Sequence, residues 1–258
     1  ILLAISSSPL AWTGTGNPFA LVGYSLGGGI CADFTSFFPD LISSLILIAP
    51  SGIVRPEHLS ERSRLLYHTP WVPPSLVNWL VKRRLRMGPN AVATTRLSVP
   101  PSTDVADAAS AEAGGQPPVD YDYASIYGNR PLVSVANAVN WQLEHHDGFV
   151  PSFISSIQRS PITHQHHRWR LIGERLSAQK ANSADEERLA QGLERSKVLI
   201  LLGRDDPIVI ADEVEEDAKA VLGKENVEVV RFDAGHEIPI SRATEVVDTM
   251  WKFWGETP

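Results

Sequence analysis

The residues best suited to do chemistry lie near the start of the chain, in the run Gly23-Tyr24-Ser25-Leu26-Gly27. An apolar run from Phe19 to Val22 precedes them and predicts a β-strand, and the amphipathic run that follows predicts a helix. A serine at so sharp a strand-to-helix turn must adopt sparsely populated backbone angles, and we expect Gly23 and Gly27 to leave room for the crossing chains. This pattern is typical of a nucleophile elbow, which would lift the Ser25 hydroxyl above the sheet.

The two neighbours of Ser25 are expected on the oxyanion and substrate-binding side of this site. The backbone N–H of Leu26 stands at the positive end of the predicted helix and would face a developing oxyanion, and Tyr24 would lie beside the substrate. In the helix itself, Ile30, Phe34 and either Phe37 or Phe38 share one side, which we expect to pack on the sheet. The alternative to a catalytic elbow is a glycine-rich turn without chemistry.

A serine hydroxyl is a poor nucleophile at neutral pH, so it needs a general base and an acid that orients the base. Two later loops supply candidates. One loop follows the apolar run 197–203 and contains Asp205 and Asp206, and the other follows the run 226–232 and contains His236. Both loops would lie at the carboxyl ends of their strands, beside Ser25, and either aspartate could be the acid.

The elbow, together with the order Ser, Asp, His, resembles the α/β-hydrolase fold family. Within that family the chain is similar to the capped serine hydrolases, which include carboxylesterases, lipases and carbon–carbon bond hydrolases. The resemblance covers residues 1–53 and about 194–258. The family's Gly-x-x-Asp-x-x-Val/Ile pattern favours Asp206 over Asp205, because Gly203 and Val209 then fall in place. A serine at the elbow disfavours epoxide opening and halide displacement, for which relatives carry an aspartate.

The fold class that follows is α/β, with a mostly parallel sheet that lacks the first strands of the family and a helical cap. Strands are predicted near Phe19, Leu45, Val198 and Val227, the last of them nearer the sheet edge because apolar and charged residues alternate in it. Residues 1–53 and 194–258 would form the core. Residues 54–193 would form the cap, with helices around 65–67, 76–85, 133–146 and 153–157 and a mobile loop at 99–118.

Several cap residues allow more than one interpretation. Aromatic side chains could line an apolar pocket, although packing between helices is the favoured reason for them; they are Trp71, Trp79, Trp141, Phe149, Phe153 and Trp169. The run His164-Gln165-His166-His167 could bind a metal, but no carboxylate or cysteine is spaced to complete the ligand shell. A polar cap helix is favoured, and we predict no metal and no cofactor.

The composition of the chain restricts the kinds of molecule that we expect it to bind. The formal net charge of −7 offers no basic field for nucleic acid, and no apolar run is long enough to span a bilayer. Cys31 is the only cysteine, which rules out an intrachain disulfide. The first residues lack the basic lead of a secretory signal, and no loop for a second oxyanion donor precedes Pro18. We therefore expect an N-terminally truncated chain. Its cellular location is left open, with the cytoplasm favoured.

The predicted function is hydrolysis of an ester, or of a C–C bond next to a carbonyl, in an apolar small molecule. Ser25 would attack the carbonyl, His236 would relay the proton, Asp206 would fix the imidazole, and the Leu26 N–H would bind the oxyanion. Two alternatives stay open. One is an acyltransferase that uses the same residues, and the other is a truncated, non-catalytic binding protein with a hydrolase-like fold.

Overall fold

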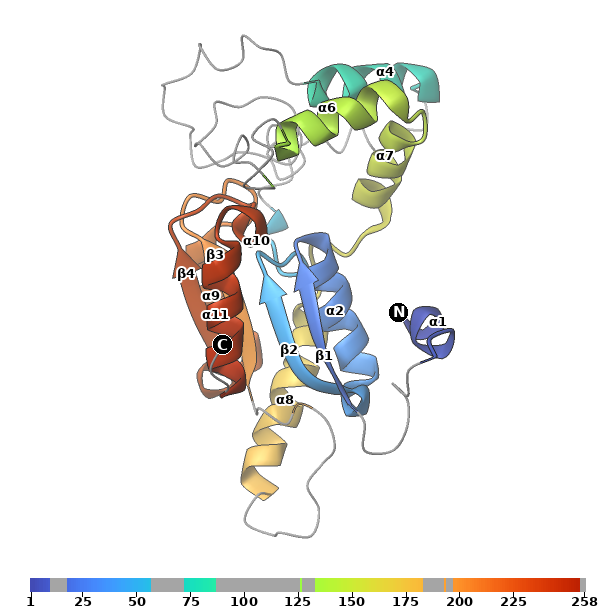
Figure 1. Cartoon of the computed structure of the whole chain (residues 1–258). Helices are drawn as coiled ribbons and strands as arrows, with labels where there is room; N and C mark the ends of the chain where they lie inside the picture. Colours follow the sequence, from blue (N-terminus) through green and yellow to red (C-terminus); the bar gives the residue numbers. More distant parts are fainter. Residues whose placement is uncertain are drawn as a thin grey trace.

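A four-stranded parallel sheet forms the centre of the molecule. The computed structural model describes residues 1–9, 18–56, 72–86, 126, 133–182, 193 and 197–255. The strands are β1 (Phe19–Tyr24), β2 (Ile42–Ile48), β3 (Val198–Gly203) and β4 (Val227–Phe232), and they lie side by side in that order. All four predicted strands are thus confirmed, and the α/β fold class with them (Figure 1).

The sequence of each strand matches its place in the sheet. Every residue of β3 is buried, because this continuous apolar strand has neighbours on both sides and helices on both faces. In β4, Val227 and Phe232 are buried while Glu228 is exposed, as the alternating sequence predicted for a strand at the end of the described sheet. The carboxyl ends of all four strands meet at one edge of the sheet, which is where the predicted site residues follow.

Helices cover both faces of the sheet (Figure 1). On one face α2 (Leu26–Phe37), α8 (His166–Asn182) and α9 (Ala211–Leu222) pack side by side, and on the other lies α11 (Ala243–Trp254). The indole of Trp254 reaches β2, where its Nε1 donates to Ser44 Oγ at 2.9 Å. Four of the other described elements are short: α1 (Leu2–Ser6), the 3-10 turns η1 (Pro39–Leu41) and η4 (Lys224–Asn226), and α10 (Ile238–Ser241).

The prediction for the inner side of α2 is wrong in detail. Phe34 is buried as expected, but Ile30 is 43%, Phe37 54% and Phe38 38% exposed. Besides Phe34, the buried side of α2 carries small residues, among them Cys31 and Ala32.

No helix in the described ranges combines the length and apolarity needed to cross a bilayer.

Three helices above the carboxyl edge of the sheet form a separate layer (Figure 1). They are α4 (Pro74–Leu85), α6 (Val135–His145) and α7 (Phe149–Arg159), which confirms the helices expected around 76–85, 133–146 and 153–157. They share a small apolar cluster of their own, which includes Val81, Leu85 and Leu143. The expected helix at 65–67 and the expected mobile loop at 99–118 lie outside the described residues.

Helix α8 belongs to the core layer although its residues fall within the range 54–193 expected for the cap. Trp169, Ile172 and Leu176 are buried in the main apolar cluster together with the residues of β2 and β3. The range 54–193 therefore includes a core helix, and the exact limits of the cap stay a prediction.

Candidate active site

Ser25 occupies the sharp turn between β1 and α2. Its backbone angles, φ 52° and ψ −122°, lie in a region that non-glycine residues rarely adopt. Two hydrogen bonds to the end of β2 hold it there: Ser25 N donates to the Ile48 carbonyl at 2.9 Å, and Ser51 N donates to the Ser25 carbonyl at 3.0 Å. Both backbone polar groups of the strained residue are thus bonded to the end of β2 or to the loop that follows it.

The glycines around the turn differ in what they permit. A Cβ atom at Gly23 would lie 2.6 Å from the Gly27 carbonyl oxygen and 2.8 Å from Cys31 Sγ, so this position requires glycine. At Gly27 an added Cβ would meet nothing within 4 Å, and the expectation that this glycine makes room for a crossing chain is wrong. The close approach on the helix side occurs one residue later, where a Cβ at Gly28 would lie 2.6 Å from Pro50 Cβ.

The loops after β3 and β4 are held together by backbone hydrogen bonds. Arg204 N donates to the Phe232 carbonyl at 2.9 Å, and Asp205 N donates to the Ala234 carbonyl at 3.1 Å. A Cβ atom at Gly203 would overlap with the carbonyl oxygen of Gly235, so only glycine lets the two chains cross so closely. These contacts bring the loop that carries Asp206 next to the loop that carries His236.

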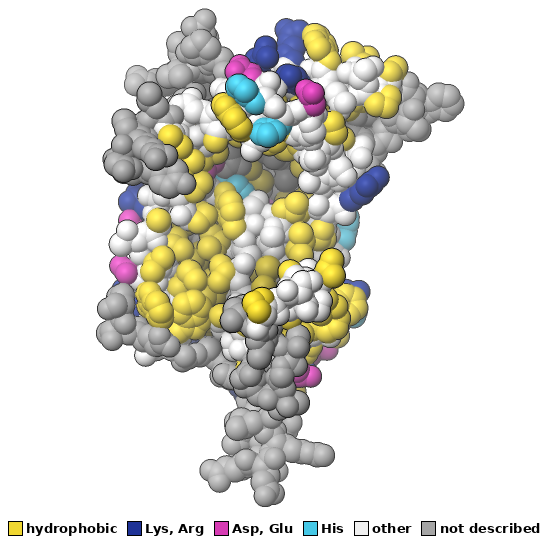
Figure 2. Space-filling model, turned by 45° about the vertical axis from the view of Figure 1, so that its right-hand side comes forward, with side chains coloured by type: hydrophobic (Ala, Val, Ile, Leu, Met, Phe, Trp, Pro, Cys, Tyr) yellow, Lys and Arg dark blue, Asp and Glu magenta, His cyan; other side chains and the backbone are white. Residues whose placement is uncertain are grey.

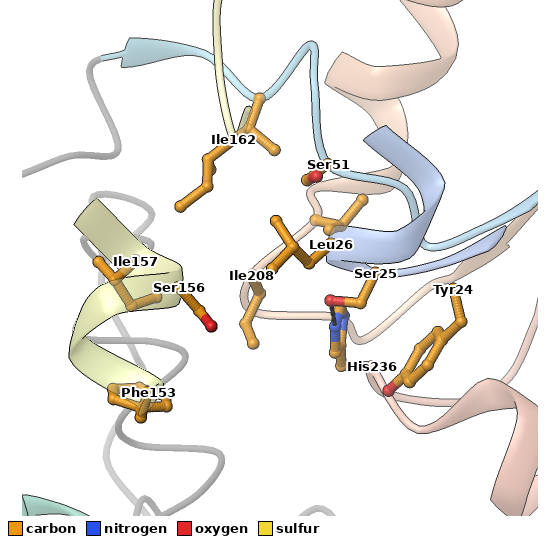
Figure 3. Close-up of a pocket in the computed structure, with 12 residues that line it drawn as sticks. Tyr24, Ser25, Leu26, Ser51, Phe153, Ser156, Ile157, Ile162, Ile208 and His236 are labelled. Carbon is orange, nitrogen blue, oxygen red and sulfur yellow. Dashed lines mark hydrogen bonds between the residues drawn. The ribbon is translucent and has the colours of Figure 1, made fainter. Parts of the chain in front are cut away.

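A continuous hydrogen-bond chain joins the three residues that the sequence singled out. His236 Nε2 lies 2.7 Å from Ser25 Oγ, and His236 Nδ1 lies 2.8 Å from Asp206 Oδ2 (Figure 3 shows the Ser25–His236 bond). The second carboxylate oxygen, Asp206 Oδ1, accepts from the backbone N–H groups of Ile208 and Val209, both at 2.8 Å. Asp206 is buried and Asp205 is exposed, so it is Asp206 that the structure brings to the histidine.

The charges around His236 favour its protonated form. Burial of the imidazole lowers its pKa, but the charge of Asp206, the hydrogen bond that this carboxylate accepts from the imidazole and the charge of Glu237 together raise the pKa above its ordinary value. Glu237 is itself only 3% exposed. Two carboxylates therefore stabilise an imidazolium at this position, which is the charge state that follows transfer of the serine proton.

The neighbours of Ser25 also lie at the site. Leu26 is the first residue of α2, so its N–H has no acceptor within the helix and stands at the positive end of the helix dipole. The Tyr24 ring lies 5.3 Å from the His236 ring, centroid to centroid, at an angle of 38°. Figure 3 shows Tyr24 beside the histidine, on the side away from the cap.

Ser25 and His236 open into a pocket of about 230 Å³ between core and cap. Its walls are mainly apolar, and Figure 3 shows residues of the core on one side and residues of α7 on the other. Besides Ser25, His236, Tyr24 and Leu26, the lining residues are Ser51, Val54, Phe153, Ser156, Ile157, Ile162, Ile208 and Val209. The cavity is visible as a hollow below the cap in Figure 2.

The aromatic residues of the expected cap have different roles. Phe153 lines the pocket, whereas Phe149 packs in the small cap cluster and Trp169 is fully buried in the main core. Trp79 and Trp141 are each 53% exposed and belong neither to the described pocket lining nor to either buried cluster. Trp71 lies outside the described residues.

Sequence reasoning missed three polar residues of the site region. Ser51 follows β2 at the same edge where Asp206 and His236 follow their strands, so the strand-end rule used for those two residues could have found it. Ser156 comes from α7 and lines the pocket opposite the core, a position that no local pattern indicates. Glu237 is adjacent to His236 in the sequence, but its burial is a tertiary property.

No group of three or more His, Cys, Asp or Glu side chains within the described ranges is placed to hold a metal ion. Gln165, within the histidine-rich run, is buried. Cys31 is also buried, and desolvation raises the pKa of its thiol to about 11. A thiol with this pKa carries almost no thiolate at neutral pH, so it is unsuited to nucleophilic attack.

The profile of the alpha/beta hydrolase family matches residues 3–249, which is nearly the whole chain. The chain belongs to the alpha/beta hydrolase family. This confirms the resemblance that the elbow and the residue order indicated. No curated protein shows significant sequence similarity to it.

Solved structures of this family resemble the chain at low identity. A meta-cleavage product hydrolase from Pseudomonas fluorescens IP01 is 13% identical with a TM-score of 0.48, over 92% of this chain and 65% of that one. A 2-hydroxy-6-oxo-6-phenylhexa-2,4-dienoate hydrolase from Rhodococcus sp. strain RHA1 is 16% identical with a TM-score of 0.49, over 92% and 64%. A carboxylesterase of Nitrososphaera gargenis is 14% identical with a TM-score of 0.44, over 91% and 63%. The chain thus spans just under two thirds of the length of each.

Proposed function

We propose that this alpha/beta hydrolase is a serine hydrolase that cleaves an ester of an apolar small molecule through an acyl-enzyme. The observation that carries the proposal is the chain of hydrogen bonds Ser25–His236–Asp206, at 2.7 and 2.8 Å, at the mouth of an apolar pocket. A base within hydrogen-bond reach of a hydroxyl, itself oriented by a buried carboxylate, is the arrangement that activates a serine.

Each residue has a defined part in the proposed reaction. Ser25 Oγ attacks the ester carbonyl while His236 Nε2 takes its proton, and the Leu26 N–H donates to the oxyanion of the tetrahedral intermediate. As that intermediate collapses, His236 passes the proton to the leaving alkoxide and an acyl-Ser25 ester remains. Water, deprotonated by the same imidazole, then releases the acid and restores the serine. Asp206 keeps Nδ1–H as the donor and stabilises the imidazolium throughout.

The lining of the pocket supports an apolar substrate. Leu26, Ile208 and Val209 on the core side face Phe153 and Ile157 of α7. Burial of an acyl or aryl group among them would contribute about 25 cal/mol per Å² of apolar surface. The described lining carries no charged side chain other than the histidine, which suits an uncharged substrate such as an ester.

The test is turnover of p-nitrophenyl esters by the wild type and two serine variants. Ser25→Ala should lower kcat by about 10⁶-fold, because the nucleophile is lost. Ser51→Ala is the matched control: it removes a hydroxyl from the same pocket and should keep most of the turnover. Equal activity of Ser25→Ala and wild type would refute the proposal. Absence of turnover in the wild type across short and medium acyl chains would favour a binding protein, and product partitioning toward an added alcohol would favour an acyltransferase.

A further inference from the structure

Helix α4 has two apolar sides, and the described residues bury only one of them. Val77, Val81 and Leu85 pack into the cap cluster against α6 and α7. On the outer side, Leu76 is 45%, Trp79 53% and Leu80 37% exposed. A helix at the surface of a globular protein normally carries polar residues on its outer side, so three large apolar side chains at spacing i, i+3, i+4 require another explanation.

The same helix is basic in an acidic protein. The segment Pro73–Arg86 contains lysine and arginine but no aspartate or glutamate, whereas the whole chain has a formal net charge of −7. Arg83 continues the outer side by one turn, with its guanidinium carbon 5.6 Å from the centre of the Trp79 ring, and Arg86 follows at the helix end. Figure 2 shows Lys and Arg side chains beside hydrophobic ones at the top of the cap, where Figure 1 places α4.

The neighbouring cap helix limits the basic surface to α4. Helix α6 adds a further exposed indole, Trp141, whose ring stacks on His145 at 4.9 Å between centroids. It also carries the acidic residues Glu144 and, just beyond its end, Asp147. The cationic groups are therefore a local feature of α4.

We propose that the outer side of α4, formed by Leu76, Trp79, Leu80, Arg83 and Arg86, binds the surface of an anionic lipid bilayer. Tryptophan and leucine side chains enter the boundary between headgroups and acyl chains, and arginines next to them pair with lipid phosphates. A short helix with both groups on one exposed side matches a helix that lies in the plane of the bilayer surface.

A second copy of the chain fits this side less well. In a two-fold dimer the same patch meets itself, so two surfaces of the same positive charge would be brought together with no acidic residue of α4 to offset it. An anionic bilayer supplies both an apolar layer and the opposite charge. Charge complementarity therefore selects the lipid surface.

Lipid binding at α4 would place the bilayer on the cap side of the pocket. Helix α4 packs on α7 with its inner side, and α7 lines the pocket with Phe153, Ser156 and Ile157. The inference does not depend on the proposed hydrolysis, because lipid binding is measured without turnover.

The experiment is co-sedimentation of the full chain with phosphatidylcholine vesicles that contain about one third phosphatidylglycerol, beside vesicles of phosphatidylcholine alone. The wild type should bind the anionic vesicles and lose binding as the salt concentration rises. Arg83→Gln/Arg86→Gln should weaken binding by about 25-fold, since each cation near such a surface contributes about fivefold. The matched control Arg170→Gln/Lys224→Gln also removes two positive charges, from exposed sites on the core, and should bind as the wild type does.

The contribution of the apolar residues of α4 to vesicle binding is tested by Leu76→Ser/Trp79→Ser. Val247→Ser is the control, at an exposed apolar residue of α11. Only the α4 variant should lose vesicle binding. Thermal unfolding checks that the Leu76→Ser/Trp79→Ser variant is folded. If that variant is unfolded, the Arg83→Gln/Arg86→Gln variant tests the proposal instead. Failure of the wild type to bind anionic vesicles, or equal loss in the core controls, would overturn the proposal. A concentration-dependent dimer that the α4 variant abolishes would assign this side to a second copy.

Discussion

The core and the cap hold their functional residues in different ways. Ser25, Asp206 and His236 stand at the ends of parallel strands, in loops tied by backbone hydrogen bonds of 2.9 to 3.1 Å, and two of the three residues are 5% exposed. The cap contributes Phe153, Ser156 and Ile157 from one helix that packs in a small cluster of its own. Groups that react need fixed positions, which the sheet provides, whereas groups that select a substrate or a surface need shape and polarity.

Of the substitutions that distinguish the core from the cap, we expect the one at Asp206, the acid of the core, to have the largest effect on activity. Asp206→Asn should lower kcat about 10⁴-fold, because the amide no longer holds His236 in the tautomer that accepts the serine proton. Asp205→Asn changes the exposed neighbour in the same loop and should leave kcat nearly unchanged. Steady-state kinetics of both variants decides the point, and a larger loss from Asp205→Asn would contradict the assignment.

Alanine substitutions at the two glycines of the elbow should have different effects on stability. Gly23→Ala places a methyl group 2.6 Å from a backbone oxygen and should lower the free energy of unfolding by about 3 kcal/mol. Gly27→Ala meets open space at the start of α2 and should leave stability unchanged or raise it by up to about 1 kcal/mol. Chemical denaturation measures both. Equal destabilisation would show that the elbow is packed differently.

A cap residue should change selectivity without changing the chemistry. Ile157→Ala enlarges the pocket on the α7 side and should reduce kcat/KM for a medium-chain ester about tenfold while the acetyl ester is hydrolysed as before. Leu80→Ala, on the outer side of α4, serves as the control for a general effect of cap truncation. Parallel losses for short and medium esters would mean that the cap supports the catalytic residues directly.

The smallest effect is a shift of the pH profile. His236 must be neutral to accept the Ser25 proton, and its pKa is raised, so kcat/KM should rise with pH through a pKa above 6.5. Glu237→Gln removes a charge that favours the imidazolium, so the acid limb should move to lower pH. Glu245→Gln, on the exposed side of α11, should not move it. A shift of the limb to higher pH in Glu237→Gln would contradict the electrostatic account.

The sequence predicted the core far better than its surroundings. Continuous apolar runs and the turn at Ser25 are local signals, and parallel strands bring the residues at their carboxyl ends together, so the positions of Asp206 and His236 followed. The buried side of α2 was not predicted correctly, because Ile30 and Phe37 are as apolar as Phe34, and only the packing of the helix on the sheet decides which of them is buried. The core packing of Trp169 and the placement of Ser156 depend on contacts across elements that no local pattern encodes.

The most direct test of the central claim is covalent labelling with a fluorophosphonate, which reacts with activated serines and is located by peptide mass spectrometry. The account predicts one label on Ser25, and its loss in His236→Ala, while Ser51 and Ser156 in the same pocket stay unmodified. A folded protein that remains unlabelled at Ser25, or that is labelled equally at Ser51, would contradict the claim that His236 and Asp206 activate Ser25.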